Sequence, residues 1–269
     1  MLHLFSIFTF SIKVKNMFTK AIIRIPSKSM INGLSSADLG LPNYELALEQ
    51  HKEYEYALLM CGLDVITLEA DENFPDSTFV EDVALCTPHC AIITRPGAES
   101  RRDEIAEMKE VLKDEYDKIE EIQAPGTIEA GDIMMVANHY YIGISARTNE
   151  EGAKQMIAIL EKYGMTGSVV SLEKVLHLKT GLAYLENNFL VACGEFLEKE
   201  EFKKFKILEI EEAESYAANC IWVNDTVIIP KGFPKAKQVI EKTAYEIIEL
   251  DMSEFQKLDG GLSCLSLRY

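Results

Sequence analysis

Residues 129–163 read EAGDIMMVANHYYIGISARTNEEGAKQMIAILEKY, and they hold the pattern that decides the fold. Two apolar runs, residues 133–136 and 140–143, flank a short polar turn, which is typical of a β-hairpin. In the segment that follows, residues 150–163, apolar side chains recur at the spacing of a helix. Asn149 is of a residue type that caps helix starts. The stretch therefore predicts a hairpin followed by a helix.

The same order of signals recurs along the chain, and a strand-like run precedes each copy. These runs are residues 65–68, 119–122, 168–172, 205–210 and 245–250. Further hairpins are predicted at residues 83–85 with 91–94, 181–185 with 189–193, and 220–223 with 227–230. Further helices are predicted at residues 99–113, 195–204 and 234–244. The repeating unit is therefore strand, hairpin, helix.

The two ends of the chain complete one unit between them. The last copy has a single strand, residues 261–267, and residues 20–26 form a strand without a hairpin partner before a helix at 44–61. Each unit buries its apolar face against its neighbours, so we predict a closed ring. The predicted fold class is α/β, a five-bladed α/β propeller of five pseudo-symmetric repeats, with residues 17–269 as a single domain.

Residues 1–16 differ from the rest of the chain. They hold an apolar stretch at residues 4–12 that resembles the core of a secretion signal, but no Lys or Arg precedes it and no small-residue cleavage pattern follows it. The stretch is also too short to span a bilayer as a helix. We expect an N-terminal extension outside the fold, and a secretion signal is the alternative.

Charge and cysteine content exclude several classes of partner. The chain has 44 acidic and 27 basic residues, a formal net charge of −17, which disfavours nucleic acid and anionic membranes. Six cysteines without a C-x-x-C pair fit a reduced, cytoplasmic protein rather than a disulfide framework. Cys86, His89 and Cys90 lack a fourth zinc ligand at suitable spacing, so no metal and no cofactor are expected.

The repeat brings distant polar residues together. Glu81 and Glu129 are 48 positions apart, and so are Glu129 and His177. Cys264 lies 87 positions after His177, and Asn219 lies between these two residues in the sequence. In a closed ring, residues at equivalent positions of each unit meet at one end of the central channel. We therefore expect these side chains to surround one pocket.

Cys264 and His177 are the candidate reactive pair in that pocket. A lone cysteine or a histidine among apolar residues is more often part of a core. Their equivalent positions in the repeat favour a role in a reaction over a place in the core. A thiolate is a strong nucleophile, and an imidazole donates and accepts protons near neutral pH. Gly260 and Gly261, just before the cysteine, allow a close approach of the backbone to a ligand.

Several carboxylates accompany this pair and indicate a cationic ligand. Glu81, Asp82, Glu129 and Asp132 precede predicted hairpins, and Asp76 lies just upstream. Carboxylates that share a buried cavity need a cation between them. With too few His or Cys ligands for a transition metal, a guanidinium is the better match, because its planar donors pair with carboxylates two at a time.

These residues carry a resemblance that extends from Met17 to Tyr269. The segments that carry it are FPDSTFVEDVALC, AIITRPGAESRR, EAGDIMM, SARTNEEGA, KVLHLKTGLAYLE, ESYAANCIWVN and LDGGLSCLSLR. In them the chain resembles the dimethylarginine dimethylaminohydrolase family, bacterial type, of the guanidino-group-modifying (pentein) superfamily. The resemblance implies a five-bladed α/β propeller and a homodimer.

The resemblance also implies roles for individual residues. Cys264 matches the nucleophile, His177 the general acid and base, and Glu129 a carboxylate that orients the site. Glu81 and Asp82 match an acidic pair facing the substrate, with Asp82 on the guanidinium. The positions that hold the amino-acid part of the substrate or line its pocket are matched by Asp76, Arg101, Arg147, Leu258 and Asp259. Leu34, in the segment 27–40, matches a residue of a lid.

The implied reaction is hydrolysis of Nω-methylated L-arginine, asymmetric dimethylarginine or monomethylarginine, through a covalent thiouronium on the cysteine. The products are L-citrulline and dimethylamine or methylamine. An arginine deiminase or an amidinotransferase on the same fold is the alternative. A non-catalytic protein that binds arginine-like cations is a further alternative from a different class.

Overall fold

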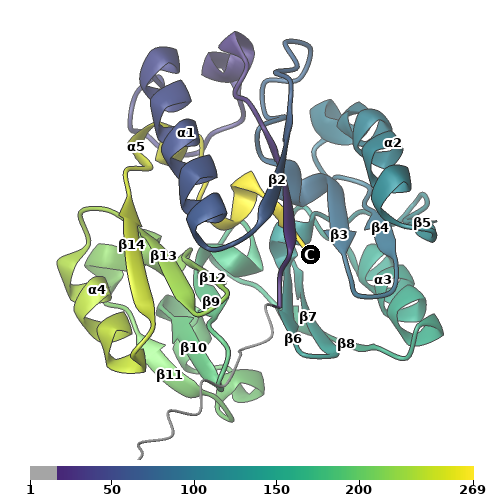
Figure 1. Ribbon diagram of the computed structural model, residues 1–269. Coiled ribbons are helices and arrows are strands. Elements are labelled where there is room, and N and C mark those ends of the chain that lie inside the picture. Colours follow the sequence, from purple (N-terminus) through teal and green to yellow (C-terminus); the bar gives the residue numbers. More distant parts are fainter. Residues whose placement is uncertain (1–16) are drawn as a thin grey trace, which may run out of the picture.

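The computed structural model describes residues 17–269 (Figure 1). These residues form five three-stranded sheets, β15–β1–β2, β3–β4–β5, β6–β7–β8, β9–β10–β11 and β12–β13–β14. In every sheet the first two strands of this order are antiparallel and the last two are parallel. Each sheet with its connections is a blade. Four blades contain a predicted hairpin and a third strand, and in the fifth β15 and β1, from the two ends of the chain, take the place of the hairpin.

The strands are short, as the sequence pattern indicates. Their bounds are β1 (Lys20–Arg24), β2 (Asp64–Leu68), β3 (Ala84–Cys86), β4 (Ala91–Ile93), β5 (Ile119–Glu121), β6 (Ile133–Val136), β7 (His139–Ile144), β8 (Thr166–Ser171), β9 (Leu182–Tyr184), β10 (Phe189–Ala192), β11 (Lys206–Glu209), β12 (Ile221–Val223), β13 (Thr226–Pro230), β14 (Glu246–Leu250) and β15 (Leu267–Arg268). The middle strands are almost wholly buried, as β4 and β13 illustrate.

The first and last strands close the ring. Ala21 pairs with Arg268 and Ile22 with Leu267 in the antiparallel ladder between β1 and β15, while β1 pairs in parallel with β2. Figure 1 shows the C-terminus beside the purple β1. The prediction that the two ends complete one unit is confirmed, and closure removes the unpaired edge that an open arrangement would leave.

Helices cover the outer side of the blades (Figure 1). They are α1 (Tyr44–Met60), α2 (Ile105–Glu115), α3 (Glu150–Lys162), α4 (Pro234–Ile240) and α5 (Ser253–Gln256). In α3 the side chain of Asn149 accepts a hydrogen bond from the backbone nitrogen of Gly152 at 2.8 Å, so the predicted cap is confirmed. Met156 and Leu160 are fully buried on the face that covers β8.

Three predicted elements differ from the structure. Residues 195–204 form two 3-10 turns, Gly194–Leu197 and Glu200–Phe202, in place of a helix. Phe196 and Phe202 are both buried, yet six positions along a regular α-helix would leave their side chains about 120° apart, on different faces of the helix. The helix predicted from residue 99 begins at Ile105, after a 3-10 turn. The strand predicted at residues 261–267 is reduced to β15, which begins at Leu267.

A 3-10 turn precedes the first strand of every sheet, and these turns meet at one end of the channel. They are Val80–Val83, Ala130–Asp132, Leu178–Thr180, Glu212–Ala218 and Ser263–Leu265. Hydrogen bonds join neighbouring turns: the backbone nitrogens of Gly131 and Leu178 donate to Asp82 and Asp132, and Ser263 donates from its backbone to Asn219 and from its hydroxyl to Glu81. The repeat therefore gathers residues distant in sequence, as predicted.

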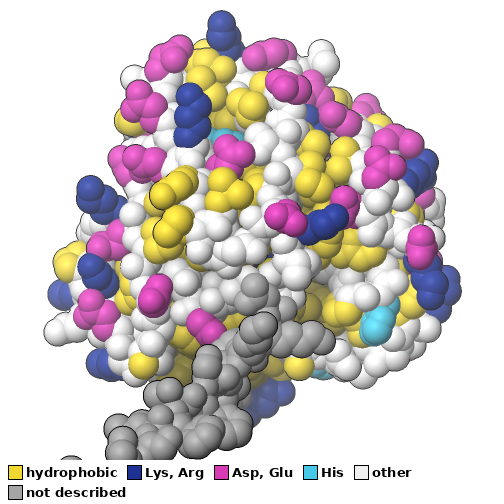
Figure 2. Space-filling view, viewed as in Figure 1, with side chains coloured by type: hydrophobic (Ala, Val, Ile, Leu, Met, Phe, Trp, Pro, Cys, Tyr) yellow, Lys and Arg dark blue, Asp and Glu magenta, His cyan; other side chains and the backbone are white. Residues whose placement is uncertain are grey.

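The surface carries charges of both signs. On the face shown in Figure 2, Asp and Glu side chains are interspersed with Lys and Arg rather than segregated from them. None of the helices in residues 17–269 is both long and apolar enough to cross a membrane.

Candidate active site

A cavity of about 200 Å³ lies where the 3-10 turns meet. It is lined by Leu34, Ser35, Ser36, Asp76, Phe79, Asp82, Arg101, Glu129, Arg147, Leu176, His177, Leu258, Asp259, Gly260 and Cys264. Cys264 and His177 thus line the same cavity. Of the residues that the sequence placed around this pocket, Glu81, Asp132 and Asn219 do not line it. The sequence did not single out Ser35, Ser36, Phe79 or Leu176, and their positions next to predicted residues were the only signal available.

Glu81 lines a different cavity, and its contact with a substrate stays a prediction. Its carboxylate forms an ion pair with Lys179 and accepts a hydrogen bond from the hydroxyl of Ser263 at 3.0 Å. Glu81 and Asp82 are neighbours on a 3-10 turn, where successive side chains point about 120° apart. One of the two carboxylates therefore reaches the cavity with Cys264, and the other points away from it.

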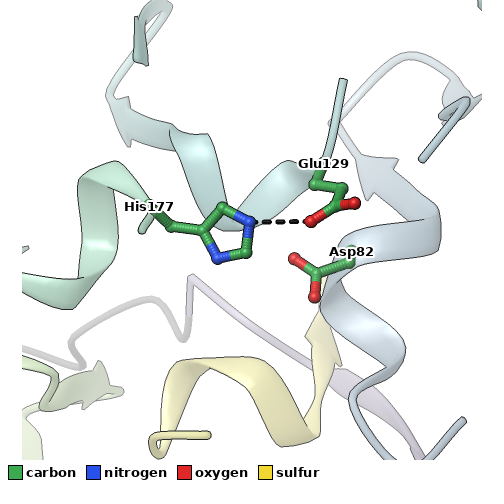
Figure 3. A group of neighbouring side chains, drawn as sticks. All are labelled: Asp82, Glu129 and His177. Atoms are coloured by element: carbon green, nitrogen blue, oxygen red, sulfur yellow. Dashed lines mark hydrogen bonds and ion pairs between the residues drawn. The ribbon is translucent and has the colours of Figure 1, made fainter. Parts of the chain in front are cut away.

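His177 and Glu129 form the central pair of the site. Figure 3 shows the imidazole projecting toward the carboxylates of Glu129 and Asp82. Its Nε2 atom lies 2.8 Å from Oε2 of Glu129. Burial lowers the pKa of His177, but Asp82, the hydrogen bond to Glu129 and Asp132 outweigh it and raise this pKa to about 9. The imidazole is therefore protonated at neutral pH and is ready to give a proton to a leaving group.

The second oxygen of Glu129 connects it to the neighbouring loops. Oε1 accepts a hydrogen bond from the backbone nitrogen of Ala98 at 3.1 Å, and Nη1 of Arg147 lies 3.8 Å from the same oxygen. Glu129 is 2% exposed. Both of its oxygens are thus engaged, which fixes the orientation of the carboxylate toward the imidazole.

Asp82 is held from both sides. Its Oδ2 atom lies 2.6 Å from Nη1 of Arg101, and its Oδ1 accepts a hydrogen bond from the backbone nitrogen of Gly131 at 3.1 Å. A Cβ atom at Gly131 would lie 2.8 Å from that oxygen and 3.0 Å from the ring of His177, so only glycine allows this approach. Burial raises the pKa of Asp82, but His177 and Arg101 dominate and lower it, so the carboxylate stays ionised.

Arg101 lines the cavity, but its donors are used within the protein. Its Nε donates to Glu104, its Nη1 to Asp82, and its Nη2 to Glu104 and the backbone oxygens of Asp76 and Phe79. Arg101 is 4% exposed. Arg101 therefore lines the pocket and holds Asp82 in place, and its contact with a substrate stays a prediction. Arg147 is the half-buried arginine of the cavity.

Cys264 lies on the 3-10 turn that follows the two glycines. Its Sγ atom accepts a long hydrogen bond, 3.4 Å, from the backbone nitrogen of Gly261. A Cβ atom at Gly261 would lie 2.4 Å from the side chain of Asn219, so this turn needs glycine. Burial, and then the charges of Glu81 and Asp82, raise the pKa of the thiol to about 12. In the empty site the sulfur of Cys264 is therefore a neutral thiol.

A segment near the N-terminus covers the cavity. Leu34 donates from its backbone nitrogen to Oδ1 of Asp76 at 2.9 Å. The backbone nitrogen and hydroxyl of Ser36 both donate to Oδ2 of Asp259, and the hydroxyl of Ser35 donates to the backbone oxygen of Lys257 at 2.7 Å. The segment is thus attached to both sides of the cavity, as expected for a lid, while the Leu34 side chain remains 40% exposed.

Asp82, Glu129 and His177 are also the one group of three potential metal ligands found among residues 17–269, with ligand atoms within 4.8 Å of one another. Their chemistry fits a protonated imidazole better than a metal. The ligand atoms are already engaged within the protein, because Arg101 pairs with Asp82 and Nε2 of His177 lies 2.8 Å from Oε2 of Glu129. Cys86, His89 and Cys90 do not form such a group in the described part of the chain.

A ring of five α/β blades with a cysteine, a histidine and carboxylates at one mouth of its channel is the pentein fold of the guanidino-group-modifying enzymes. A family model described as N,N dimethylarginine dimethylhydrolase, eukaryotic, matches residues 40–266. The N(G),N(G)-dimethylarginine dimethylaminohydrolase of Pseudomonas aeruginosa is 61% identical over 254 residues, which are 94% of this chain and 100% of that protein. The chain belongs to the dimethylarginine dimethylaminohydrolase family.

Solved structures agree with this assignment. The Pseudomonas aeruginosa protein with a cysteine replaced by serine, complexed with citrulline, has a TM-score of 0.93 at 60% identity, covering 94% of this chain and 100% of that one. A dimethylarginine dimethylaminohydrolase with a histidine replaced by glycine, in an adduct with S-methyl-L-thiocitrulline, has the same TM-score, identity and coverage. Both structures contain small ligands of the citrulline type.

Proposed function

We propose that this protein hydrolyses Nω-methylated L-arginine to L-citrulline and dimethylamine or methylamine. The observation that carries the proposal is the shared cavity of Cys264 and His177, lined also by the carboxylates of Asp76, Asp82 and Glu129. A thiol, an imidazole and several carboxylates around one small cavity suit attack on the carbon of a planar cation. Family membership and the citrulline bound to a relative support the same reaction.

In the first half of the reaction the sulfur of Cys264 replaces the methylated amine. Asp82 holds the guanidinium, and the arriving cation offsets the negative charges that keep the thiol neutral, so the thiol loses its proton to solvent. The thiolate then adds to the guanidinium carbon. The protonated His177 gives its proton to the methylated nitrogen, the carbon–nitrogen bond breaks, and a thiouronium and a neutral amine result.

In the second half, water releases the product. The neutral His177 takes one proton from a water molecule as the water oxygen adds to the thiouronium carbon. The carbon–sulfur bond then breaks, the sulfur leaves as a thiol with a proton from the adduct, and citrulline forms. Glu129 keeps the imidazole oriented and stabilises its charged form in both halves.

The rest of the cavity is proposed to hold the amino-acid part of the substrate. Arg147 suits the α-carboxylate, and Asp76 with the backbone at Leu258 and Asp259 suits the α-ammonium. Leu34 closes over the ligand as part of the segment attached to Asp259. The homodimer and the cytoplasmic location stay predictions; the six free cysteines fit the second of these.

A specificity panel tests the proposed function. Purified protein is incubated with dimethylarginine, monomethylarginine and arginine, and citrulline and released amine are measured against a Cys264→Ser control. We expect the two methylated substrates to be turned over at least tenfold more efficiently than arginine. Ammonia release from arginine at the highest efficiency would establish a deiminase instead, and transfer of the amidino group to an added amine would establish an amidinotransferase.

A covalent probe separates an enzyme from a binding protein. A haloamidine carries a guanidinium-like cation and a group that alkylates thiols, so it should inactivate the protein by modifying Cys264. Reversible binding of the probe without modification of this cysteine would favour a non-catalytic protein that binds arginine-like cations.

A further inference from the structure

A second cavity, of about 130 Å³, lies inside the channel and is separate from the cavity that contains Cys264. We refer to it as the far cavity. Residues from the inner strands β3, β6, β9, β12 and β15 line it, together with Glu81, Lys179, Ser263 and Arg268. Neither the proposed reaction nor its substrate uses this space.

The far cavity contains donors without acceptors. The Nε and Nη1 atoms of Arg268 are shielded from solvent and have no hydrogen-bond partner among residues 17–269, and the same holds for the indole nitrogen of Trp222. Both side chains line the cavity. The ring of Phe18 lies over the guanidinium at 6.0 Å and covers one of its faces. Buried donors of this kind require an occupant, either ordered water or an ion.

The charges select between these occupants. Lys179 and Arg268 both act on the buried Glu81: burial raises the pKa of Glu81, and Lys179 and then Arg268 lower it. Lys179 forms the ion pair with Glu81, which leaves the charge of Arg268 without a carboxylate of its own. The remaining acid of the cavity, Glu186, forms no ion pair with either cation among residues 17–269.

Two cations therefore share one carboxylate in a partly buried cavity, where the Nε and Nη1 atoms of Arg268 are shielded from solvent. An uncompensated buried charge is costly, and an anion beside the guanidinium removes that cost while it accepts the free hydrogen bonds. We propose that the far cavity is a binding site for a small monovalent anion, held by the guanidinium of Arg268 and the indole N–H of Trp222. A halide is the simplest ion of this kind, and the cavity of about 130 Å³ has room for it together with water molecules.

Bromide is the probe that tests this site, because it scatters anomalously and has the required size and charge. Crystals of the full chain grown without halide are soaked in sodium bromide. We expect an anomalous difference peak within hydrogen-bonding distance of Arg268 and Trp222. Ordered water in the far cavity with no anomalous peak would overturn the proposal, and this readout needs no substitution.

A stability measurement gives the matched comparison in solution. Bromide replaces the bulky anion gluconate at constant ionic strength, and the melting temperature is followed in three proteins. We expect a rise of about 3 °C at a bromide concentration roughly tenfold above Kd in the wild type and in Arg102→Met. Arg102 lies outside both cavities and pairs with Glu99, so its substitution controls for the loss of one positive charge. Arg268→Met should show no rise, and an equal rise in that variant would contradict the site.

Discussion

The carboxylate of Asp132, which has no exposed surface, accepts a hydrogen bond from the backbone nitrogen of Leu178 at 2.9 Å. Leu178 directly follows His177, so this bond fixes the backbone from which the imidazole projects. The other oxygen of Asp132 accepts from the hydroxyls of Ser145 at 2.7 Å and Thr148 at 2.6 Å. One buried carboxylate thus joins two blades next to the candidate active site.

The two hydroxyls extend the network to other residues of the site. The hydroxyl of Ser145 accepts from the backbone nitrogen of Arg147 at 3.0 Å, and that of Thr148 accepts from the backbone nitrogen of Glu129 at 3.2 Å. Each hydroxyl has a single proton, and each gives it to Asp132, because a carboxylate only accepts. The direction of every bond is therefore set by the charge of Asp132.

We predict that Asp132→Asn damages the site more than the fold. An amide offers one oxygen in place of two and turns an NH₂ group toward donors. Because Asp132 is one of the charges that raise the pKa of His177, this pKa should fall below about 9 in the variant. We also expect kcat/KM for dimethylarginine to fall roughly 10- to 100-fold through misplacement of the imidazole. Kinetics and NMR titration of His177 measure the two effects.

Asn224→Ala is the matched control for that variant. The side chain of Asn224 joins the backbones of Phe18 and Cys61, and it lies outside the cavity that contains His177. Its removal should lower stability without changing the pKa of His177. If the histidine of Asp132→Asn still titrated near 9, the carboxylate would have a structural role only.

The reactivity of Cys264 should depend on the charge of the reagent. Burial and the charges of Glu81 and Asp82 raise the pKa of the thiol to about 12, so little thiolate exists at neutral pH. Alkylation by neutral iodoacetamide should therefore be slow at pH 7 and rise about tenfold for each pH unit up to pH 10. A cationic haloamidine should react faster at pH 7, because its charge offsets the two carboxylates.

Mass spectrometry of the modified peptide assigns each rate to this cysteine, and Cys264→Ser supplies the background from the remaining thiols. Rapid modification by iodoacetamide that does not vary between pH 7 and pH 10 would show that the thiolate already exists in the empty site. In that case the substrate would not be needed to activate the nucleophile.

His177→Gly should separate the two halves of the reaction. The variant retains Cys264 but lacks the base that takes a proton from water, so a thiouronium on the sulfur should accumulate. S-methyl-thiocitrulline is the suitable substrate, because its methanethiol leaving group needs no proton from an acid. We expect turnover to fall by 10²- to 10⁴-fold while intact-protein mass spectrometry detects the adduct. Release of citrulline at the wild-type rate would exclude His177 as the base.

The ring and most of the site follow from the sequence because they depend on spacing. Two intervals of 48 residues place Glu129 and His177 at equivalent positions of neighbouring blades, and closure between β1 and β15 then brings Cys264 to the same mouth of the channel. The repeat intervals and the closure of the ring do not depend on the direction of any side chain, so both could be predicted from the sequence.

What the sequence could not predict depends on side-chain direction and local turns. Glu81 and Asp82 are adjacent and chemically alike, and only the 120° step of a 3-10 turn sends them to different cavities. The hydrogen bonds from Ser36 to Asp259 join segments more than 220 positions apart, and no periodic signal marks them. The hydrogen bonds of Arg101 are a further example, because no sequence signal indicates that Asp82, Glu104 and two backbone oxygens accept from it.

Acid sensitivity provides a prediction about the fold itself. His51 on α1 is 2% exposed, and its Nε2 atom has no hydrogen-bond partner among the described residues. Burial lowers its pKa from 6.5 to about 4, against the opposing effects of Glu55 and the backbone of Arg24. Because the folded pKa lies below the unfolded value, the neutral imidazole stabilises the fold fully above pH 6.5. This contribution, about 3 kcal/mol at most, is lost as the pH falls from 6.5 to 4.

The matching experiment follows the free energy of unfolding in urea between pH 7.5 and pH 4, in the wild type, His51→Gln and His89→Gln. The wild type should lose stability steeply below pH 6.5, and His51→Gln should lose less over the same range because glutamine does not titrate there. His89 is exposed, so its replacement controls for removal of a histidine from the surface. Identical slopes in all three proteins would mean that carboxylates such as Asp82, rather than His51, set the acid limit of the fold.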